Sequence, residues 1–376
     1  MGIDAIFNTH NWAVVPFHFW SLCFFVLGTI VGSFLNVCIY RMPLDLSVVS
    51  PPSHCPKCKY AIPFYLNVPL VTWLTLGGKC KNCGLPISPR YFIVELLTGV
   101  TFLACWLSFG AVSAWLAVVY SIFLAGLITA TFIDFEHFII PDEITIGGAV
   151  AGFIASLCLP GLLQGGKNTA EGAVLSIVGI VVGAGVVYGV LRMGKLLFGR
   201  YKITLPAPAT VVFSETALCL PGKELPFEDI FYRQSDTIII QATTVELVDR
   251  GYKNVTVRLS PAALWIDDEK INPVEVQHLE AVCGEIVLPR EAMGLGDVKF
   301  VAAIGAFLGW QGALFSLMAS SVIGAAVGVV LILARRREWS SKMPYGPYIA
   351  AAATVWVFCG KHLMHVLFGA DYLNWR

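Results

Sequence analysis

The chain has 376 residues, of which 57% are apolar and only 13% are charged. Soluble domains contain about 45–50% apolar and about 25% charged residues, so we expect lipid to solvate most of this chain. Its 25 basic and 25 acidic residues cancel, which argues against nucleic acid as a partner.

The N-terminal region predicts a membrane helix rather than a cleavable signal peptide. Residues 1–11 lack a basic stretch and carry Asp4. The first apolar run, at residues 17–40, is long enough to cross a bilayer, because a crossing needs about 20 residues. Arg41 ends this run in a stop-transfer pattern.

Apolar windows along the chain predict an α-helical polytopic membrane protein with about eight transmembrane helices. The sixth and seventh windows are separated only by Gly309-Trp310-Gln311-Gly312. The eight expected spans cover residues 17–40, 91–109, 112–133, 143–160, 171–193, 298–312, 313–334 and 347–369.

Two segments interrupt this pattern, at residues 41–90 and 194–292. The second holds 14 of the 25 acidic residues and several alternating or β-branched runs, which predicts a small β-rich domain. We therefore expect five parts. They are a periplasmic segment with the first helix (1–40), a cytosolic four-cysteine loop (41–90), helices two to five (91–193), an inserted cytosolic β-rich domain (194–292) and helices six to eight (293–376).

The basic residues predict the orientation of the chain in the membrane. Lysine and arginine concentrate in the loops after the first, fifth and seventh expected spans, and the alternate loops carry few of them. Positively charged loops stay on the cytosolic side of membranes. The pattern therefore places the N-terminus outside the cell and the three basic loops in the cytosol.

Four of the eleven cysteines form two CxxC pairs, Cys55 with Cys58 and Cys80 with Cys83, separated by 21 residues. This is close to the spacing of structural zinc sites with four cysteine ligands. Neighbouring lysines favour thiolates, and a reducing cytosol favours a metal over disulfides. A redox or disulfide role is the alternative. We expect the other seven cysteines to be small packing residues.

Two aspartates stand at the ends of expected membrane helices. Asp134 follows directly on the third span, and Gly294-Leu295-Gly296-Asp297 opens the sixth. Carboxylates at membrane depth are costly and tend to face polar cavities. Two carboxyl groups that share one proton can activate water and protonate a scissile carbonyl, as in aspartic proteases. Aspartate at a helix N-terminus is also a common cap, which explains Asp297 or Asp142 without catalysis.

Other charged residues near these positions allow more than one interpretation. Glu95 is expected to pair structurally or to contact a substrate leader, and the structural role is favoured. Glu136 and Asp142 either bind a positive leader or belong to a solvated interfacial loop. Lys299 either influences an aspartate or meets lipid headgroups. His137 has no role in the aspartate mechanism.

Several stretches, in order, resemble bacterial prepilin peptidases, also called type IV prepilin-like leader peptidases. They are the first-helix signature from Gly32 through Asn36 to Pro43, the paired CxxC loop, Arg90-Tyr91 with Glu95, Asp134 with Pro141-Asp142, Gly294 to Lys299, and Pro344-Tyr345-Gly346-Pro347 in place of the family's Pro-Phe-Gly-Pro. The chain departs from the family pattern in one respect, because residues 194–292 intervene between the fifth span and the GxGD motif.

The resemblance implies that Asp134 and Asp297 are the protease pair. The family cuts the leader from type IV prepilins and type II secretion pseudopilins at the cytosolic face of the bacterial inner membrane. Many members then methylate the new N-terminus with S-adenosylmethionine, an activity associated with the cysteine loop. The sequence shows no Rossmann-type glycine-rich cradle, so the methyl-donor site receives no residues.

Two other functions compete with this interpretation. One is a different GxGD intramembrane protease that acts on transmembrane substrates, and the paired CxxC loop and the signature around Asn36 argue against it. The other is a membrane transporter or assembly scaffold whose aspartates relay protons. Such a protein would need neither a zinc loop nor acidic residues gathered on the cytosolic side.

Overall fold

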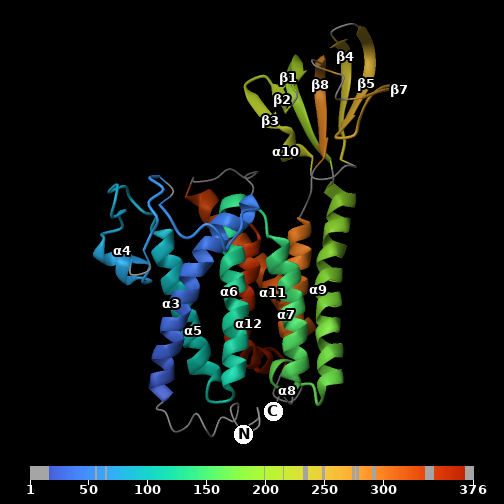
Figure 1. Cartoon of the computed structure of the whole chain (residues 1–376). Coiled ribbons are helices and arrows are strands. Elements are labelled where there is room, and N and C mark those ends of the chain that lie inside the picture. Colours follow the sequence, from blue (N-terminus) through green and yellow to red (C-terminus); the bar gives the residue numbers. More distant parts are fainter. Residues whose placement is uncertain are drawn as a thin grey trace. The chain divides into compact units, whose positions relative to one another are not determined.

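The chain divides into two compact units in the computed structural model (Figure 1). One comprises Met1–Val187 and Leu295–Arg376, and the other comprises Tyr188–Gly294. The structure describes residues 17–55, 57–63, 66–198, 200–214, 216–231, 236–247, 250–272, 276, 279–289, 294–334 and 343–368. The expected N-terminal segment before residue 17, Met293 and the basic loop around Arg335 lie outside the described residues.

Helices make up the first unit. Five stretches within the described residues are long and apolar enough to cross a membrane, which makes the chain a multi-pass membrane protein: Phe17–Leu44, Arg90–Phe109, Ala114–His137, Thr169–Gly194 and Leu295–Leu333. The predicted count of eight spans stays a prediction. The helices are α3 (Phe17–Arg41), η1 (Met42–Leu44), α4 (Val71–Thr75), α5 (Arg90–Phe109), α6 (Ala114–His137), α7 (Asp142–Cys158), α8 (Pro160–Leu163), α9 (Thr169–Phe198), α11 (Leu295–Leu333) and α12 (Gly346–Phe368).

Helices α3 and α5 pack closely because small residues line their contact. A Cβ atom added to Gly28 would lie 2.8 Å from Gly99 Cα, and one added to Gly32 would lie 2.7 Å from Glu95 Cα. Glycines four residues apart allow membrane helices to approach at backbone distance. This contact fixes the N-terminal part of α5, and therefore the cysteine loop that precedes it, against the first helix.

Helix α11 is broken where the sequence separates the sixth and seventh expected spans. Gly309 has φ 70° and ψ 179°, which is not helical. Three side chains donate to the carbonyl oxygen of Ala306, one turn earlier: Ser156 Oγ at 3.3 Å, Gln164 Nε2 at 2.6 Å and Ser176 Oγ at 3.0 Å. An unsatisfied backbone group costs several kcal/mol in lipid, so these donors stabilise the break.

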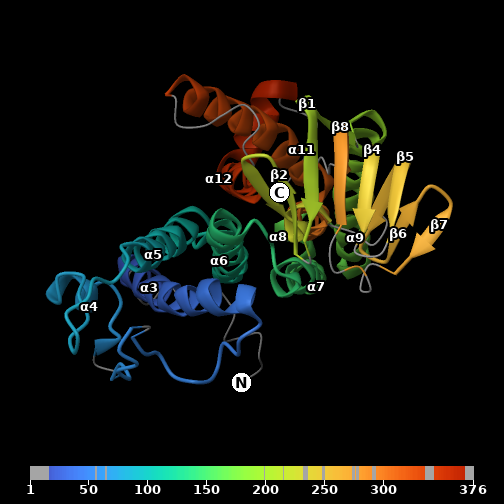
Figure 2. The same ribbon diagram turned by 90° about the horizontal axis from the view of Figure 1, so that it is seen from above.

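The second unit contains an antiparallel sheet of eight strands, which confirms the predicted β-rich domain. The strand order is β3-β2-β1-β8-β4-β5-β6-β7, and Figure 2 shows β1, β8, β4 and β5 side by side. Alternate residues of β4 and β8, such as Ile240 and Ile286, are buried in one apolar core. The strands are β1 (Arg200–Phe213), β2 (Ala217–Leu220), β3 (Lys223–Pro226), β4 (Ile238–Leu247), β5 (Gly251–Ser260), β6 (Ala263–Ile266), β7 (Glu269–Ile271) and β8 (Leu279–Pro289), with α10 (Phe227–Ile230) after β3.

Candidate functional site

Asp134 lies in the last turn of α6 and is 5% exposed. The sequence predicted that Asp134 directly follows the third span. Helix α6 instead continues to His137, so Asp134 lies inside the helix. Its Oδ2 accepts a hydrogen bond of 2.9 Å from the backbone N–H of Gly346, the first residue of α12. The first N–H groups of a helix have no partner within it, so a carboxylate is a favourable neighbour there. Asp134 therefore joins the end of α6 to the start of α12.

Asp297 is half-buried in the first turn of α11. The neighbouring Gly296 lies against Ile140, because an added Cβ would be 3.7 Å from the Ile140 Cβ. A Cβ added to Gly346, beside Asp134, would be 3.1 Å from the Ile140 Cδ1. The buried Ile140 thus contacts the backbone next to both aspartates. The ends of α6, α11 and α12 therefore meet around one apolar side chain.

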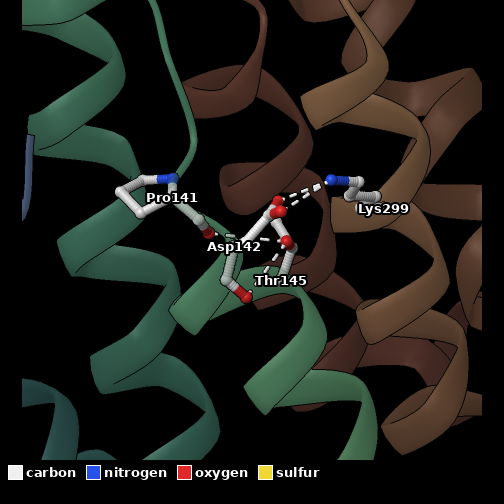
Figure 3. A network of polar contacts seen from close by, with 4 residues as sticks. All are labelled: Pro141, Asp142, Thr145 and Lys299. Carbon is white, nitrogen blue, oxygen red and sulfur yellow. Dashed lines mark hydrogen bonds and ion pairs between the residues drawn. The ribbon is translucent and has the colours of Figure 1, made fainter.

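Two ion pairs surround the aspartates. Lys299 Nζ contacts Asp142 Oδ1 at 2.6 Å and Oδ2 at 2.9 Å, which joins the first turn of α7 to α11 (Figure 3). Arg90, at the start of α5, pairs with Glu136 at the end of α6. Exposed pairs of this kind contribute about 0–1 kcal/mol each, so they orient the helix ends more than they stabilise them.

These contacts give the neighbouring charges partners within the chain. The N-cap of α7 is Pro141, so capping, which the sequence left open as an alternative for Asp142, is not the role of this residue; its carboxylate pairs with Lys299. Glu136 has Arg90 as its partner. His137 is exposed in the last turn of α6. Asp134 and Asp297 are distinguished from Asp142 and Glu136 by their shared neighbour Ile140, which contacts Gly296 beside Asp297 and Gly346 beside Asp134.

Buried polar contacts join the C-terminal end of α3 to the N-terminal end of α5. Asn36 is 2% exposed, and its Nδ2 donates to the carbonyl oxygens of Gly32 at 3.2 Å and Tyr91 at 3.0 Å. The buried Glu95 accepts the backbone N–H of Leu70 at 2.7 Å. These bonds give Glu95 the structural role that the sequence favoured, because its partner is the cysteine loop.

The four predicted metal ligands lie together in one cluster. The sulfur atoms of Cys55, Cys58, Cys80 and Cys83 are all within 4.8 Å of one another. The closest approaches are 4.0 Å between Cys55 and Cys83 and 3.9 Å between Cys58 and Cys80. Four sulfurs about 2.3 Å from a tetrahedral metal are about 3.8 Å apart, so the cluster fits a metal ion with little adjustment.

Each CxxC pair forms the same tight turn. The N–H of Lys59 donates to the Cys55 carbonyl, and that of Gly84 donates to the Cys80 carbonyl, both at 2.9 Å. Lys59 and Gly84 have positive φ angles of 59° and 69°. Glycine adopts this conformation without strain, whereas lysine does so at a cost, so the first turn is held by its surroundings.

Hydrogen bonds give the thiols unequal acidities. The backbone N–H of Tyr60 and the side chain of Asn82 lower the pKa of Cys58 to about 6. The backbone N–H groups of Cys83 and Asn82 lower the pKa of Cys80. The Leu85 N–H favours the Cys83 thiolate, but burial and the neighbouring sulfurs outweigh it and raise that pKa to about 11. The cluster thus supplies some thiolates at neutral pH, the form that binds metals.

Two family models match the chain. The bacterial peptidase A24 N-terminal domain matches residues 26–109, and the type IV leader peptidase family matches residues 121–202 and 258–329. Residues 203–257, which separate the two matched segments, lie within the unit that contains the sheet. No solved structure matches the chain significantly.

Relatives with assigned names agree with these models. A prepilin leader peptidase/N-methyltransferase of Myxococcus xanthus is 30% identical over 83% of this chain and 63% of its own length. The chain thus spans less than two thirds of that relative. A protein of the same name from Aeromonas hydrophila is 26% identical over 93% of both chains. A type 4 prepilin-like proteins leader peptide-processing enzyme of Escherichia coli is 40% identical over 34% of this chain and 54% of its own length.

The fold and the site define a multi-pass membrane protein with two aspartates at helix ends and a four-cysteine cluster. Taken with the two matching models, these features establish that the chain belongs to the type IV leader peptidase family. Two residues of the site had no role assigned from the sequence, Gly346 and Ile140. The only signal for Gly346 was its place in the Pro344 to Pro347 motif, and Ile140 resembles any other apolar residue.

Proposed function

We propose that this chain is a membrane aspartyl peptidase that removes the leader from type IV prepilins and type II secretion pseudopilins. The observation that carries the proposal is the position of Asp134 and Asp297, at helix ends that meet around Ile140. The names of the relatives support the substrate class. The match to the family models supports the reaction class.

The two carboxyl groups share the work of hydrolysis. One carboxylate takes a proton from water as the water oxygen attacks the carbonyl carbon of the scissile peptide bond. The other, protonated, gives its proton to the carbonyl oxygen. The tetrahedral intermediate then breaks its C–N bond, and the leaving amine receives a proton from the pair. The Gly346 N–H holds one oxygen of Asp134, which leaves Asp134 Oδ1 for this exchange.

The aspartates act at the cytosolic face of the bacterial inner membrane. The supporting observation is the charge of the segment between α3 and α5, which carries exposed lysines at positions 57, 59, 79 and 81. Basic loops stay in the cytosol. This segment is joined to α5 through Glu95, and Arg90 of the same helix end pairs with Glu136, two residues after Asp134. The aspartates therefore share the membrane face of the basic loop.

Cleavage by the purified full chain tests the proposal. The protein, reconstituted in lipid nanodiscs, is incubated with a prepilin, and the products are identified by mass spectrometry. The expected result is one cut that releases the intact leader. A prepilin that stays whole, under conditions in which a known prepilin peptidase cuts it, would refute the proposed activity.

A second activity, N-methylation of the new N-terminus, follows from the names of the relatives. S-adenosylmethionine would supply the methyl group when bound. No residue is assigned to its site. With the methyl donor added, we expect the mature product to gain the mass of one methyl group on its N-terminal residue, and without the donor we expect none. A product of unchanged mass in both samples would limit the chain to peptidase activity.

The four-cysteine cluster holds a structural zinc ion. Four thiolate ligands leave no open coordination position, so the ion would hold the loop together rather than take part in hydrolysis. The supporting observation is the fit of the four sulfur atoms to a tetrahedral site. The names of the relatives do not mention a metal, so the proposal rests on geometry.

Replacing a ligand is expected to remove the metal. Protein purified without chelators should contain about one zinc per chain, and Cys55→Ser or Cys80→Ser should reduce this to background. Cys158→Ser is the matched control, because Cys158 is exposed and lies outside the cluster. Elemental analysis of the three variants measures the outcome. Zinc retained in both ligand variants would contradict the assignment.

A further inference from the structure

Helix α4 in the cysteine loop presents an apolar outer face. Val68, Val71 and Leu74 are 46%, 55% and 60% exposed. Figures 1 and 2 show α4 on the outer side of α3 and α5, away from α6. Three large aliphatic side chains on one short segment are unfavourable in water, because each exposed apolar surface orders solvent that burial would release.

Contacts on the inner side of α4 fix its depth along α5. The ring of Trp73 packs on that of Phe92, with centroids 5.2 Å apart, and Leu70 N–H donates to Glu95. Phe92 and Glu95 lie roughly 3 to 8 Å along the axis from the first residue of α5, at 1.5 Å per residue. Helix α5 has 20 residues. It is therefore about 30 Å long, just the thickness of the hydrocarbon core. Its first turns, and α4 beside them, therefore lie where headgroups meet hydrocarbon.

The backbone of this segment suits an environment with little water. Val71 N–H donates to Pro69 O at 2.6 Å around Leu70, which has a positive φ of 60°. The N–H groups of Thr72, Leu74, Leu76, Gly77 and Gly78 all donate to carbonyls of residues 68–74. The Thr75 hydroxyl donates to the Val71 carbonyl at 2.9 Å. Satisfied backbone groups are a requirement for contact with lipid.

The surfaces next to α4 extend its apolar face. Ile93 and Leu97 on α5, and Phe34 on α3, are about half exposed on helices that can span the membrane. Lys79 follows α4 directly, and Lys57, Lys59 and Lys81 are exposed on the two cysteine turns. Apolar residues flanked by lysines are typical of segments that enter the interface of an anionic bilayer, with the amines at the phosphates.

We infer that residues 68–76 bind the membrane interface, with Val68, Val71 and Leu74 in the lipid and the lysines of the cysteine turns at anionic headgroups. The partner is phospholipid, and its apolar and charged parts match the two parts of the surface. The cysteine cluster is thereby held against the membrane rather than on a free cytosolic loop. This inference does not depend on the proposed peptidase activity.

Photo-crosslinking of the full chain in nanodiscs tests the inference. Benzoylphenylalanine is placed at Leu74, at Leu97 as a reference on a membrane helix, and at Lys253 as a control at an exposed position on strand β5. The nanodiscs contain equal amounts of phosphatidylglycerol and phosphatidylcholine. After illumination, mass spectrometry identifies the adducts. A symmetrical size-exclusion peak for each variant shows that it has folded.

We expect lipid adducts at Leu74 and Leu97 and only background at Lys253. Adducts at Leu74 should be enriched in phosphatidylglycerol over phosphatidylcholine, because the lysines recruit anionic lipid. Absence of lipid adducts at Leu74 while Leu97 gives them would overturn the inference. Crosslinking of Leu74 to a prepilin added to the sample, at the expense of lipid, would overturn it as well and would assign the face to the substrate. Both outcomes are measured from the crosslinked adducts, so the test does not require cleavage to be measured.

Discussion

Asp134→Asn and Asp297→Asn are each expected to lower the kcat of prepilin cleavage by about 10²–10⁴-fold, the usual contribution of a general acid or base. Asparagine has nearly the shape of aspartate, and its Oδ1 can still accept the Gly346 N–H that Asp134 Oδ2 accepts. The fold is therefore retained while the exchange of protons is lost. Single-turnover assays of both variants, with circular dichroism to check folding, measure the effect.

Asp142→Asn is the matched control for these variants. Asp142 lies at the start of α7, and its exposed carboxylate pairs with Lys299. Loss of an exposed ion pair costs about 0–1 kcal/mol, so we expect little change in cleavage. If either Asp134→Asn or Asp297→Asn cleaved as fast as the control, the assignment of a catalytic pair would be wrong.

The sequence was sufficient to predict features that depend on local composition. The apolar windows predicted the long helices, and the alternating runs predicted a sheet, because solvation by lipid and strand pairing leave periodic patterns in the chain. The spacing of Cys55, Cys58, Cys80 and Cys83 predicted one cluster because each CxxC turn directs two sulfur atoms to the same side. Family resemblance, rather than physical reasoning, singled out Asp134 and Asp297 from the other acidic residues.

Contacts between distant segments could not be predicted in the same way. Nothing local indicates that the N–H of Gly346 meets Asp134, 212 positions away. The support of the α11 break by Ser156, Gln164 and Ser176 is also tertiary, because it depends on how three helices pack. The observed end of α6 differs from the predicted end for a related reason. Helix α6 extends to His137 because its end packs against the start of α12, and hydropathy does not register that contact.

The interface inference changes how the cysteine loop is understood. The loop is basic and contains the four-cysteine cluster, so its composition alone predicted a position in the cytosol. Its contacts with Phe92 and Glu95 tie it to the first turns of α5 instead. A loop held at the headgroups shares the membrane face with Asp134, because Arg90 at the start of α5 pairs with Glu136.

The close packing of Gly346 makes it the most sensitive non-acidic position of the site. A Cβ at this position would lie 2.8 Å from Asp134 Oδ2 and 3.1 Å from Ile140 Cδ1. Gly126, on α6, has no atom within 4 Å of an added Cβ, so Gly126→Ala is a matched control in a membrane helix. Both substitutions add one methyl group, and they differ only in what that methyl group meets.

Gly346→Ala is therefore expected to reduce the kcat of cleavage by roughly 100-fold, because displacing a catalytic group by about 1 Å has an effect of that size. The added methyl group forces the Asp134 carboxylate away from the α12 N-terminus and lengthens its hydrogen bond. Overpacking also destabilises the fold by about 1–3 kcal/mol, which thermal unfolding in nanodiscs would detect. Gly126→Ala should leave both the rate and the unfolding temperature close to those of the unmodified chain. If Gly346→Ala cleaved at the control rate, the position of Asp134 against α12 would not matter for catalysis, and the hydrogen bond between them would be structural alone.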